Sequence, residues 1–216
     1  MLTEEKLTEY LLNKYHPLAI ILHGSRASGR NRLHSDWDLI LLVDKDTPTE
    51  QAIIDGSAID VEALRPDIEN QRGRLKEIGG AFHSVKILFD TDSVGEKFVA
   101  GVQELTSAGF KITSEEYNSR KLFLFRLLNR LIDAGNEHPI EFAYHFGNFL
   151  QRAINYSFQV NGRWSKSIYE AVEDIKKNNL ELAKELNTAI SNVSNTEKIE
   201  TAKRIYKLIF KENFML

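Results

Sequence analysis

Two aspartates that follow a Gly-Ser turn constrain this chain more than any other feature of its sequence. The Gly-Ser pair stands at residues 24–25, ten residues separate it from Asp36, and Asp38 follows. Apolar runs at 18–22 and 39–43 flank this block, so the turn follows one buried strand and the acids open the next. Because strand side chains alternate, both acids share a face with their Cα atoms roughly 6.6 Å apart. This spacing allows one divalent ion to bridge them.

The turn and the acids favour one combined site for a metal and a phosphate. Close carboxylates repel each other unless a cation lies between them. Mg²⁺ takes one or two protein carboxylates and fills its remaining positions with water and substrate phosphate oxygens. The small residues Gly24, Ser25, Ser28 and Gly29 let backbone N–H groups approach a phosphate, and a helix N-terminus after the turn favours anions. We therefore expect a nucleotide and Mg²⁺ at this block.

The same residues resemble the signature of the DNA polymerase β-type nucleotidyltransferase superfamily. That signature has an apolar residue, Gly-Ser, about ten residues, and then Asp, an apolar residue, Asp and an apolar residue, as in Gly24-Ser25 and Asp36-Trp37-Asp38 here. The likeness implies that Asp36 and Asp38 hold the metals, two Mg²⁺ ions, and that Gly24 and Ser25 hold the triphosphate of ATP or another nucleoside triphosphate. It further implies a mixed sheet with flanking helices, followed by a helical bundle as in aminoglycoside- and lincosamide-like members.

The family uses a third acid on a neighbouring strand, and the chain offers two candidates. An Asp-Gly turn at residues 55–56 between β-branched and apolar runs predicts a hairpin. On its second strand, Asp60 and Glu62 share one face. Asp60 stands between two apolar residues, as the family's third carboxylate does, so we assign it the third metal and catalytic position. Glu62 is the alternative.

Composition limits the class of protein and of substrate. The chain has 216 residues, 42% of them hydrophobic and 27% charged, as in ordinary globular proteins. Its apolar runs are too short to span a bilayer, its first residues do not resemble a signal peptide, and it has no cysteine, so we expect a cytoplasmic protein without disulfides or thiolate metal sites. Its net charge of −3 argues against a nucleic-acid substrate.

Local charge in the turn instead favours a single nucleotide. Arg26, Arg30 and Arg32 precede the acids, where a triphosphate would lie, and Arg26, next to Ser25, is the candidate phosphate ligand. The spacing of the two glycines also fits a P-loop. That motif needs Lys and then Ser or Thr after the second glycine, whereas Arg30 and Asn31 follow here, so we exclude it.

The pattern along the chain predicts an α/β half followed by an all-α half. Residues 1–92 show a helix, two strands, the hairpin and a further strand at 84–89, whereas residues 93–216 have helical periodicity. In the second half a capping box at residue 113 opens a helix, Pro139 opens the next, and aromatic residues concentrate at core spacing. We expect a nucleotidyltransferase domain at 1–92 and a helical bundle at 93–216.

One loop of the second half carries a further candidate. Residues 161–166 read Asn-Gly-Arg-Trp-Ser-Lys, which looks like a segment that places a lysine near the nucleotide phosphates in several antibiotic nucleotidyltransferases. The resemblance implies that Lys166 supplies positive charge for phosphoryl transfer. The alternative is a turn between helices with Trp164 packed and Lys166 in solvent.

These observations lead to one expected reaction and three alternatives. We expect Mg²⁺-dependent transfer of a nucleoside monophosphate, AMP from ATP in similar families, to a hydroxyl of a small molecule such as an aminoglycoside-like compound. The alternatives are an antitoxin-like enzyme that transfers AMP to a protein, a nucleotide-binding regulator without catalysis, and a helical interaction module with a structural α/β half. The sequence does not determine the acceptor, the preferred nucleotide or the oligomeric state.

Overall fold

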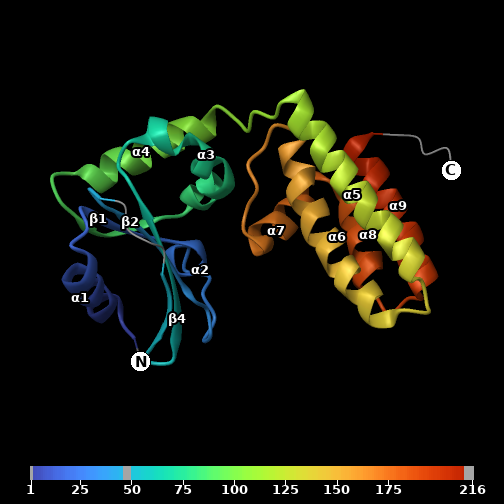
Figure 1. Ribbon diagram of the computed structural model, residues 1–216, viewed down its shortest axis with the longest axis horizontal. Helices are drawn as coiled ribbons and strands as arrows, with labels where there is room; N and C mark the ends of the chain where they lie inside the picture. The colour runs from blue at the N-terminus through green and yellow to red at the C-terminus, as the bar shows by residue number, and fades with distance from the viewer. Residues whose placement is uncertain (1, 46–49, 212–216) are drawn as a thin grey trace. The chain divides into compact units, whose positions relative to one another are not determined.

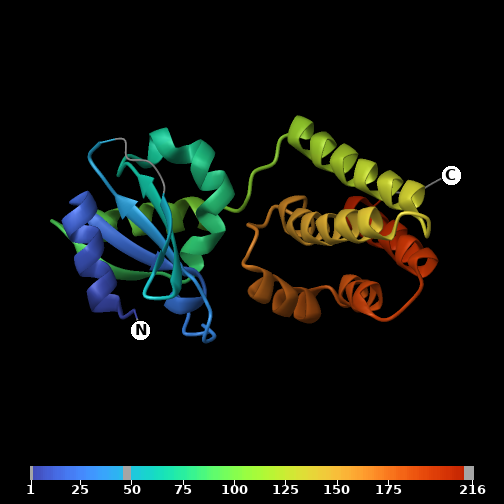
Figure 2. The same cartoon turned by 60° about the horizontal axis from the view of Figure 1, so that its bottom comes forward.

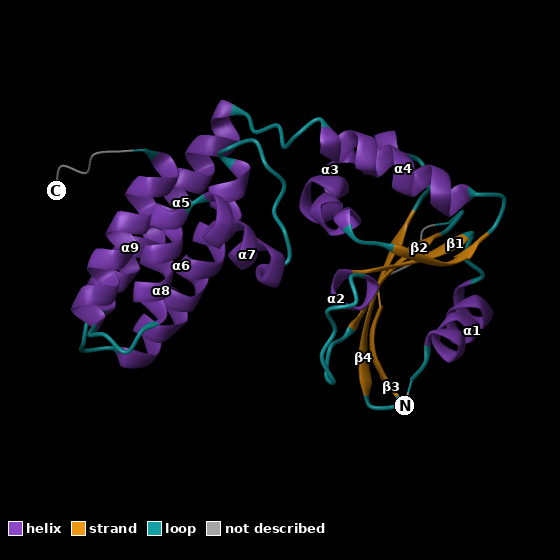
Figure 3. Cartoon of the chain, turned by 180° about the vertical axis from the view of Figure 1, so that it is seen from behind, coloured by secondary structure: helices purple, strands orange, loops and turns teal. Residues whose placement is uncertain are grey.

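The computed structural model describes residues 2–45 and 50–211 and divides them between two compact units (Figure 1). Unit 1 is Met1–Ala108 and unit 2 is Gly109–Leu216. The first contains the sheet and the second consists of helices, which confirms the expected α/β and all-α halves (Figure 3). No helix in the described ranges is both long and apolar enough to cross a membrane.

Unit 1 is built on a mixed five-stranded sheet in the order β3-β4-β2-β1-β5. Its strands are β1 (Ala19–His23), β2 (Trp37–Leu42), β3 (Glu50–Ile54), β4 (Ser57–Leu64) and β5 (Lys86–Asp90). The β2 and β4 strands pair in parallel, whereas the β1–β2, β1–β5 and β3–β4 pairs are antiparallel. The predicted hairpin is confirmed, and its turn residues Asp55 and Gly56 have φ of 49° and 74°, as a tight two-residue turn requires.

Helices cover both faces of the sheet (Figure 3). They are α1 (Glu4–Tyr15), the short α2 (Gly24–Ala27), α3 (Ile68–Ile78) with the 3₁₀ turn Gly79–His83, and α4 (Val94–Ser107). Leu7 and Leu11 of α1 pack on the face that carries Leu39 and Val61. The opposite face packs against α3 and α4 through residues that include Ile40, Leu75 and Val102. Alternation along each strand therefore directs the buried side chains of the sheet into one of two cores.

Helix α4 belongs to unit 1, and this differs from the expected division after residue 92. Phe98 and Val102 of α4 pack with Ile21 of the sheet. The Asp90 carboxylate, at the end of β5, accepts hydrogen bonds from the N–H groups of Gly95 and Glu96 at 2.8 and 2.9 Å. A helix that covers a sheet has the same periodicity as a helix in a bundle, so its sequence did not indicate which unit it joins.

Unit 2 is a bundle of helices whose buried faces are rich in aromatic residues. The helices are α5 (Ser114–Ala134), α6 (Pro139–Gln159), α7 (Ile168–Asn178), α8 (Leu180–Ile190) and α9 (Asn195–Phe210). Helices α5, α6 and α9 lie side by side (Figure 1 and Figure 2). The capping box of Thr113 and Glu116 is confirmed. Phe142, Phe149 and Phe158 are buried in the core, as expected from their spacing.

Candidate functional site

The predicted turn follows β1 directly and forms the short helix α2. Gly24 has φ of 72°, which favours glycine, and a Cβ atom built on it would lie 3.2 Å from Asp38 Cγ and collide with the Asp38 carboxylate. The turn closes on itself, because the Ser25 carbonyl accepts the N–H of Arg30 at 2.9 Å and the Ser28 hydroxyl at 3.0 Å. The turn and the second aspartate are therefore in direct contact, as the motif predicts.

Sheet register brings the acids of two strands together. Asp38 of β2 stands opposite Asp60 of β4 in the parallel pair and opposite His23 of β1 in the antiparallel pair. These three residues lie on the face of the sheet that packs, further along, against α3 and α4. Asp36 precedes β2 by one residue and is exposed, as is Asp60, whereas Asp38 is half-buried.

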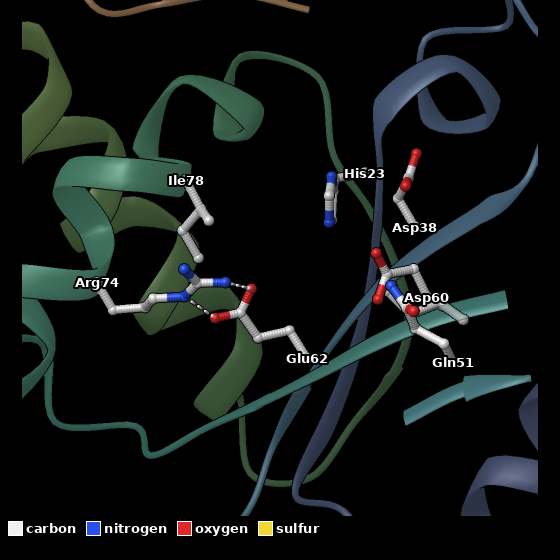
Figure 4. Close-up of a pocket in the computed structure, with 8 residues that line it drawn as sticks. His23, Asp38, Gln51, Asp60, Glu62, Arg74 and Ile78 are labelled. Atoms are coloured by element: carbon white, nitrogen blue, oxygen red, sulfur yellow. Dashed lines mark hydrogen bonds and ion pairs between the residues drawn. The ribbon is translucent and has the colours of Figure 1, made fainter. Parts of the chain in front are cut away.

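A cavity of about 540 Å³ opens at this acidic edge. Its lining residues are His23, Asp38, Leu39, Gln51, Asp60, Glu62, Arg74 and Ile78. Figure 4 shows Asp38 and Asp60 at one end and the Glu62–Arg74 pair at the other. A second, shallower hollow of about 340 Å³ lies along the β3–β4 hairpin and shares Asp60 and Gln51 with the first. The exposed Asp60 carboxylate thus borders both spaces.

The acids at this edge have more negative charge than the surrounding side chains neutralise. Burial raises the pKa of Asp38 to about 6, and the charges of Asp36 and Asp60 add to this effect, while Arg26 opposes it. Burial also lowers the pKa of His23, against the attraction of nearby acids that include Glu62 and Asp60. A bound cation would offset the burial of Asp38 and its repulsion by Asp36 and Asp60, because a cation favours the ionised carboxylate.

The donor chemistry of this edge fits Mg²⁺. Asp36, Asp38 and Asp60 offer only carboxylate oxygens, which are the ligands that Mg²⁺ prefers, and one or two of them suffice when phosphate oxygens and water complete the shell. Over residues 2–45 and 50–211, no three His, Cys, Asp or Glu side chains are grouped closely enough to hold a metal by themselves.

The alternative third acid, Glu62, has a different environment from Asp60. Arg74 of α3 donates to both Glu62 carboxylate oxygens, through Nε to one and through Nη2 at 2.9 Å to the other. Two donors on one carboxylate neutralise its charge and hold its orientation. Glu62 is therefore already compensated, and Asp60 is the acid whose charge faces the cavity.

Two candidate nucleotide ligands have partners inside their own units. The Arg26 guanidinium donates to the carbonyl oxygens of Ser35 and Asp36, so the predicted phosphate ligand contacts the backbone beside the acids. Lys166 donates to Asp174 at 2.7 Å in unit 2. The structure thus gathers Gly24, Ser25, Arg26, Asp36, Asp38 and Asp60 in unit 1, while Lys166 belongs to an ion pair in unit 2.

Three polar residues that line the cavity were not predicted as site residues from the sequence. His23 stood at a strand end with no pattern to separate packing from function, although its place directly before Gly24 was visible. Gln51 stands opposite Asp60, and this pairing depends on the register of the hairpin. Arg74 comes from α3, a helix that was not predicted. Only the assembled sheet shows that these side chains share one space with the acids.

Comparison with known proteins relates part of unit 1 to a protein family. Residues 5–69 match the family model described as "Polymerase beta, Nucleotidyltransferase". No curated protein matches the chain. Among solved structures, a nucleotidyltransferase-like protein from Exiguobacterium sibiricum is 10% identical, with a TM-score of 0.50 over 97% of this chain and 75% of that one. A chain from a structure described as a toxin-antitoxin with AMP-PNP is 20% identical, with a TM-score of 0.36 over 48% of this chain and 86% of that one.

Proposed function

We propose that this chain is a polymerase β-type nucleotidyltransferase, because residues 5–69 match that family model, and from that premise we derive its reaction. The enzyme transfers a nucleoside monophosphate, AMP from ATP, to a hydroxyl of a small molecule such as an aminoglycoside-like compound. The hydroxyl oxygen forms a bond to the α-phosphorus, the bond between the α-phosphorus and the bridging oxygen breaks, and pyrophosphate leaves. We place the protein in the cytoplasm, as the sequence suggests.

One observation carries this proposal: Asp38 and Asp60 stand opposite each other at the rim of a cavity. Within the described part of the chain, neither carboxylate forms an ion pair with a basic side chain. A structural strand does not gain from two such acids, because their repulsion and the burial of Asp38 oppose folding. A site for Mg²⁺ and phosphate accounts for these acids, because a bound cation offsets their repulsion. The Gly24 turn, which leaves room for the Asp38 carboxylate, supplies backbone for the phosphates.

Each acid has its own part in the proposed reaction. Asp36 and Asp38 would hold the metal, and Mg²⁺, expected as two ions, would supply charge stabilisation for the transferring phosphate. Asp60 shares the metal and accepts or orients the proton of the attacking hydroxyl, because its exposed carboxylate borders both hollows. Gly24 and Ser25 hold the triphosphate. The hydroxyl proton passes from Asp60 to water.

The two hollows support a reaction with two substrates. The larger one contains the Arg74 side chain, and the smaller one is lined by residues that include Ala52, Ile53 and Asp60. Donor and acceptor must meet at the reacting phosphorus, and near-attack geometry accounts for much of the rate in such reactions. We assign the larger hollow to the nucleotide and the smaller to the acceptor, so that both meet at Asp60.

Lys166 keeps its place in the proposal as a source of charge from unit 2. Its ammonium group pairs with Asp174, and Arg163 donates to the same carboxylate oxygen at 2.6 Å. Because two cations share the Asp174 carboxylate, Lys166 is less fully neutralised than in a one-to-one pair, and this supports its proposed contact with a phosphate.

An acceptor screen tests the reaction. The chain is incubated with Mg²⁺ and each nucleoside triphosphate, labelled at the α-phosphorus, together with a panel of aminoglycosides and other hydroxyl-bearing metabolites. Mass spectrometry should find a compound heavier by one nucleotide, with pyrophosphate released in equal amount. The control variants are Asp38→Asn, which should be inactive, and Glu104→Gln, which makes the same change at an exposed acid of α4.

The same assay separates the alternatives. Labelled protein with no labelled small molecule would favour the antitoxin-like enzyme that modifies a partner. Nucleotide binding without turnover on any acceptor would favour a regulator, and absence of nucleotide binding would contradict the proposed function and leave an interaction module.

A further inference from the structure

Arg26 occupies the turn that faces the acids, and its guanidinium group has three partners within unit 1. Nε donates to the Asp36 carbonyl oxygen at 2.9 Å, and Nη2 donates to the Ser35 carbonyl oxygen at 2.6 Å. The guanidinium carbon lies 4.1 Å from the centre of the Trp37 ring. The planar fork of arginine makes this combination possible, because it donates in its plane and stacks with its face.

These contacts hold the segment that enters β2. Strand pairing with β4 begins at Trp37, and pairing with β1 begins at Asp38. Asp36 lies outside this ladder, so strand register does not fix its backbone. The hydrogen bond from Arg26 to its carbonyl oxygen supplies a constraint that the sheet does not. Trp37, which separates the two aspartates, is buried beneath the same guanidinium group.

We infer that Arg26 is a positioning residue for the metal ligands Asp36 and Asp38 and not a ligand of the nucleotide phosphates. This inference rests on the proposed function, and it replaces the role that the sequence suggested for Arg26. Arg26 ties the backbone carbonyls of Ser35 and Asp36 to the turn and rests on Trp37. Both carboxylates therefore project from a backbone segment whose position is held.

Charge alone predicts the opposite effect from positioning when Arg26 is replaced. Arg26 is a cation near Asp38, so it lowers the attraction of the acids for a second cation. Loss of that charge should strengthen the binding of a divalent ion. Loss of the guanidinium hydrogen bonds should instead leave Asp36 free to move and weaken the binding of the divalent ion. Residues that orient metal ligands affect metal affinity by about 10–100-fold.

Mn²⁺ binding to the nucleotide-free chain tests the inference, with electron paramagnetic resonance as the measure of free ion. Arg26→Gln removes both the charge and the planar guanidinium group. Arg26→Lys keeps the charge, but its ammonium group cannot donate to both carbonyl oxygens while it stacks on the Trp37 ring. Both variants should bind Mn²⁺ about 10–100-fold more weakly than the parent. Arg72→Gln is the matched control, since Arg72 pairs with Glu69 on the exposed surface of α3, and it should stay within about twofold of the parent.

The absence of nucleotide makes the outcome decisive. When no phosphate is present, an arginine that only binds phosphate affects Mn²⁺ affinity through its charge alone, so unchanged or tighter binding by Arg26→Gln would overturn the inference. Circular dichroism and thermal melting establish that each variant is folded, and Arg26→Lys, the milder change, provides the comparison if Arg26→Gln unfolds. A parent that modifies acceptors but binds no Mn²⁺ without nucleotide would overturn the inference alone. A parent that neither binds nor transfers a nucleotide would overturn the proposed function as well.

Discussion

Two carboxylates, one in each unit, have opposite electrostatic environments. Asp174 of α7 accepts hydrogen bonds from Arg163, Lys166 and Asn178, and these partners hold its pKa below its ordinary value despite the burial that opposes them. At the acidic edge of unit 1, Asp38 has two further acids nearby, and burial with these charges raises its pKa to about 6. The first carboxylate is compensated by ion pairs, whereas within residues 2–45 and 50–211 the second forms no ion pair and is only partly compensated by Arg26.

This difference separates a structural acid from a functional one. A compensated carboxylate joins the loop before α7 to the helix and stabilises unit 2. An uncompensated carboxylate costs stability unless a ligand supplies the missing charge, and such groups gather at functional sites. The partners of Asp174 are side chains of the chain itself. The comparison therefore supports the proposed metal site at the acidic edge and a structural role for Asp174.

The largest expected effect is on catalysis at the acidic edge. Replacement of Asp38 by Asn should reduce transfer by several orders of magnitude, because the metal loses a ligand that stabilises the transferring phosphate. Folding should be retained, since the amide has nearly the same shape. Turnover numbers and thermal melts of the parent, Asp38→Asn and Glu104→Gln measure both effects. Turnover of Asp38→Asn within about tenfold of the parent would contradict the assignment of the metal site.

The next effect compares two acids of one strand. Asp60→Asn should abolish transfer, whereas Glu62→Gln should lower it modestly, because Glu62 is already paired with Arg74. Glu62→Gln should also lower stability, since it weakens a contact between β4 and α3. Steady-state kinetics and urea unfolding of both variants provide the measurement. The reverse ranking in turnover would move the role of third acid to Glu62.

A smaller effect tests the charge of unit 2. If Lys166 contacts the phosphates, Lys166→Ala should weaken the binding of a non-hydrolysable ATP analogue by about 1.5–3 kcal/mol, the range for a hydrogen bond to a charged group. Arg163→Ala is the matched control, because it also removes one cation from Asp174. Isothermal titration of both variants separates the roles. Equal, small changes in affinity would leave Lys166 as a structural partner of Asp174.

The smallest effect is on stability and depends on pH. The folded pKa of Asp38, about 6, lies above its ordinary value of 3.8, so between these values the folded state binds more protons than the unfolded state. The contribution of Asp38 to stability must therefore fall as pH rises through this window. Without metal, the stability of Asp38→Asn relative to the parent should increase from pH 4 to about pH 7 and then level off. Urea unfolding across this range checks the sign, and a flat difference would contradict it.

The chain's local chemistry was enough to predict most of its elements. The Asp-Gly turn predicted the hairpin, the capping box and Pro139 predicted the starts of α5 and α6, and the spacing of glycine and aspartate predicted the family. These features depend on contacts between residues close in sequence, or on chemistry that needs particular residue types. Such information is present before the chain folds.

The remaining features depend on contacts between distant residues. Helix α3 was not predicted, because few apolar residues mark its buried face, and its Arg74 reaches Glu62 only once β4 is in place. Helix α4 joins unit 1 because its apolar side chains pack with Ile21 of the sheet and Phe82 of the 3₁₀ turn, although its periodicity suits a bundle equally well.

The site itself divides in the same way. The sequence by itself determined which residues are the candidates for the proposed chemistry: the glycine turn, Asp36, Asp38 and the acids of the hairpin. The tertiary structure alone decided which strands carry them side by side and which charges remain without a partner. Asp60 and Glu62 have the same spacing and the same charge in sequence, but Glu62 lies within reach of an arginine from α3 and Asp60 does not share that partner. Electrostatic compensation depends on distances in space, and a strand pattern contains only distances along the chain.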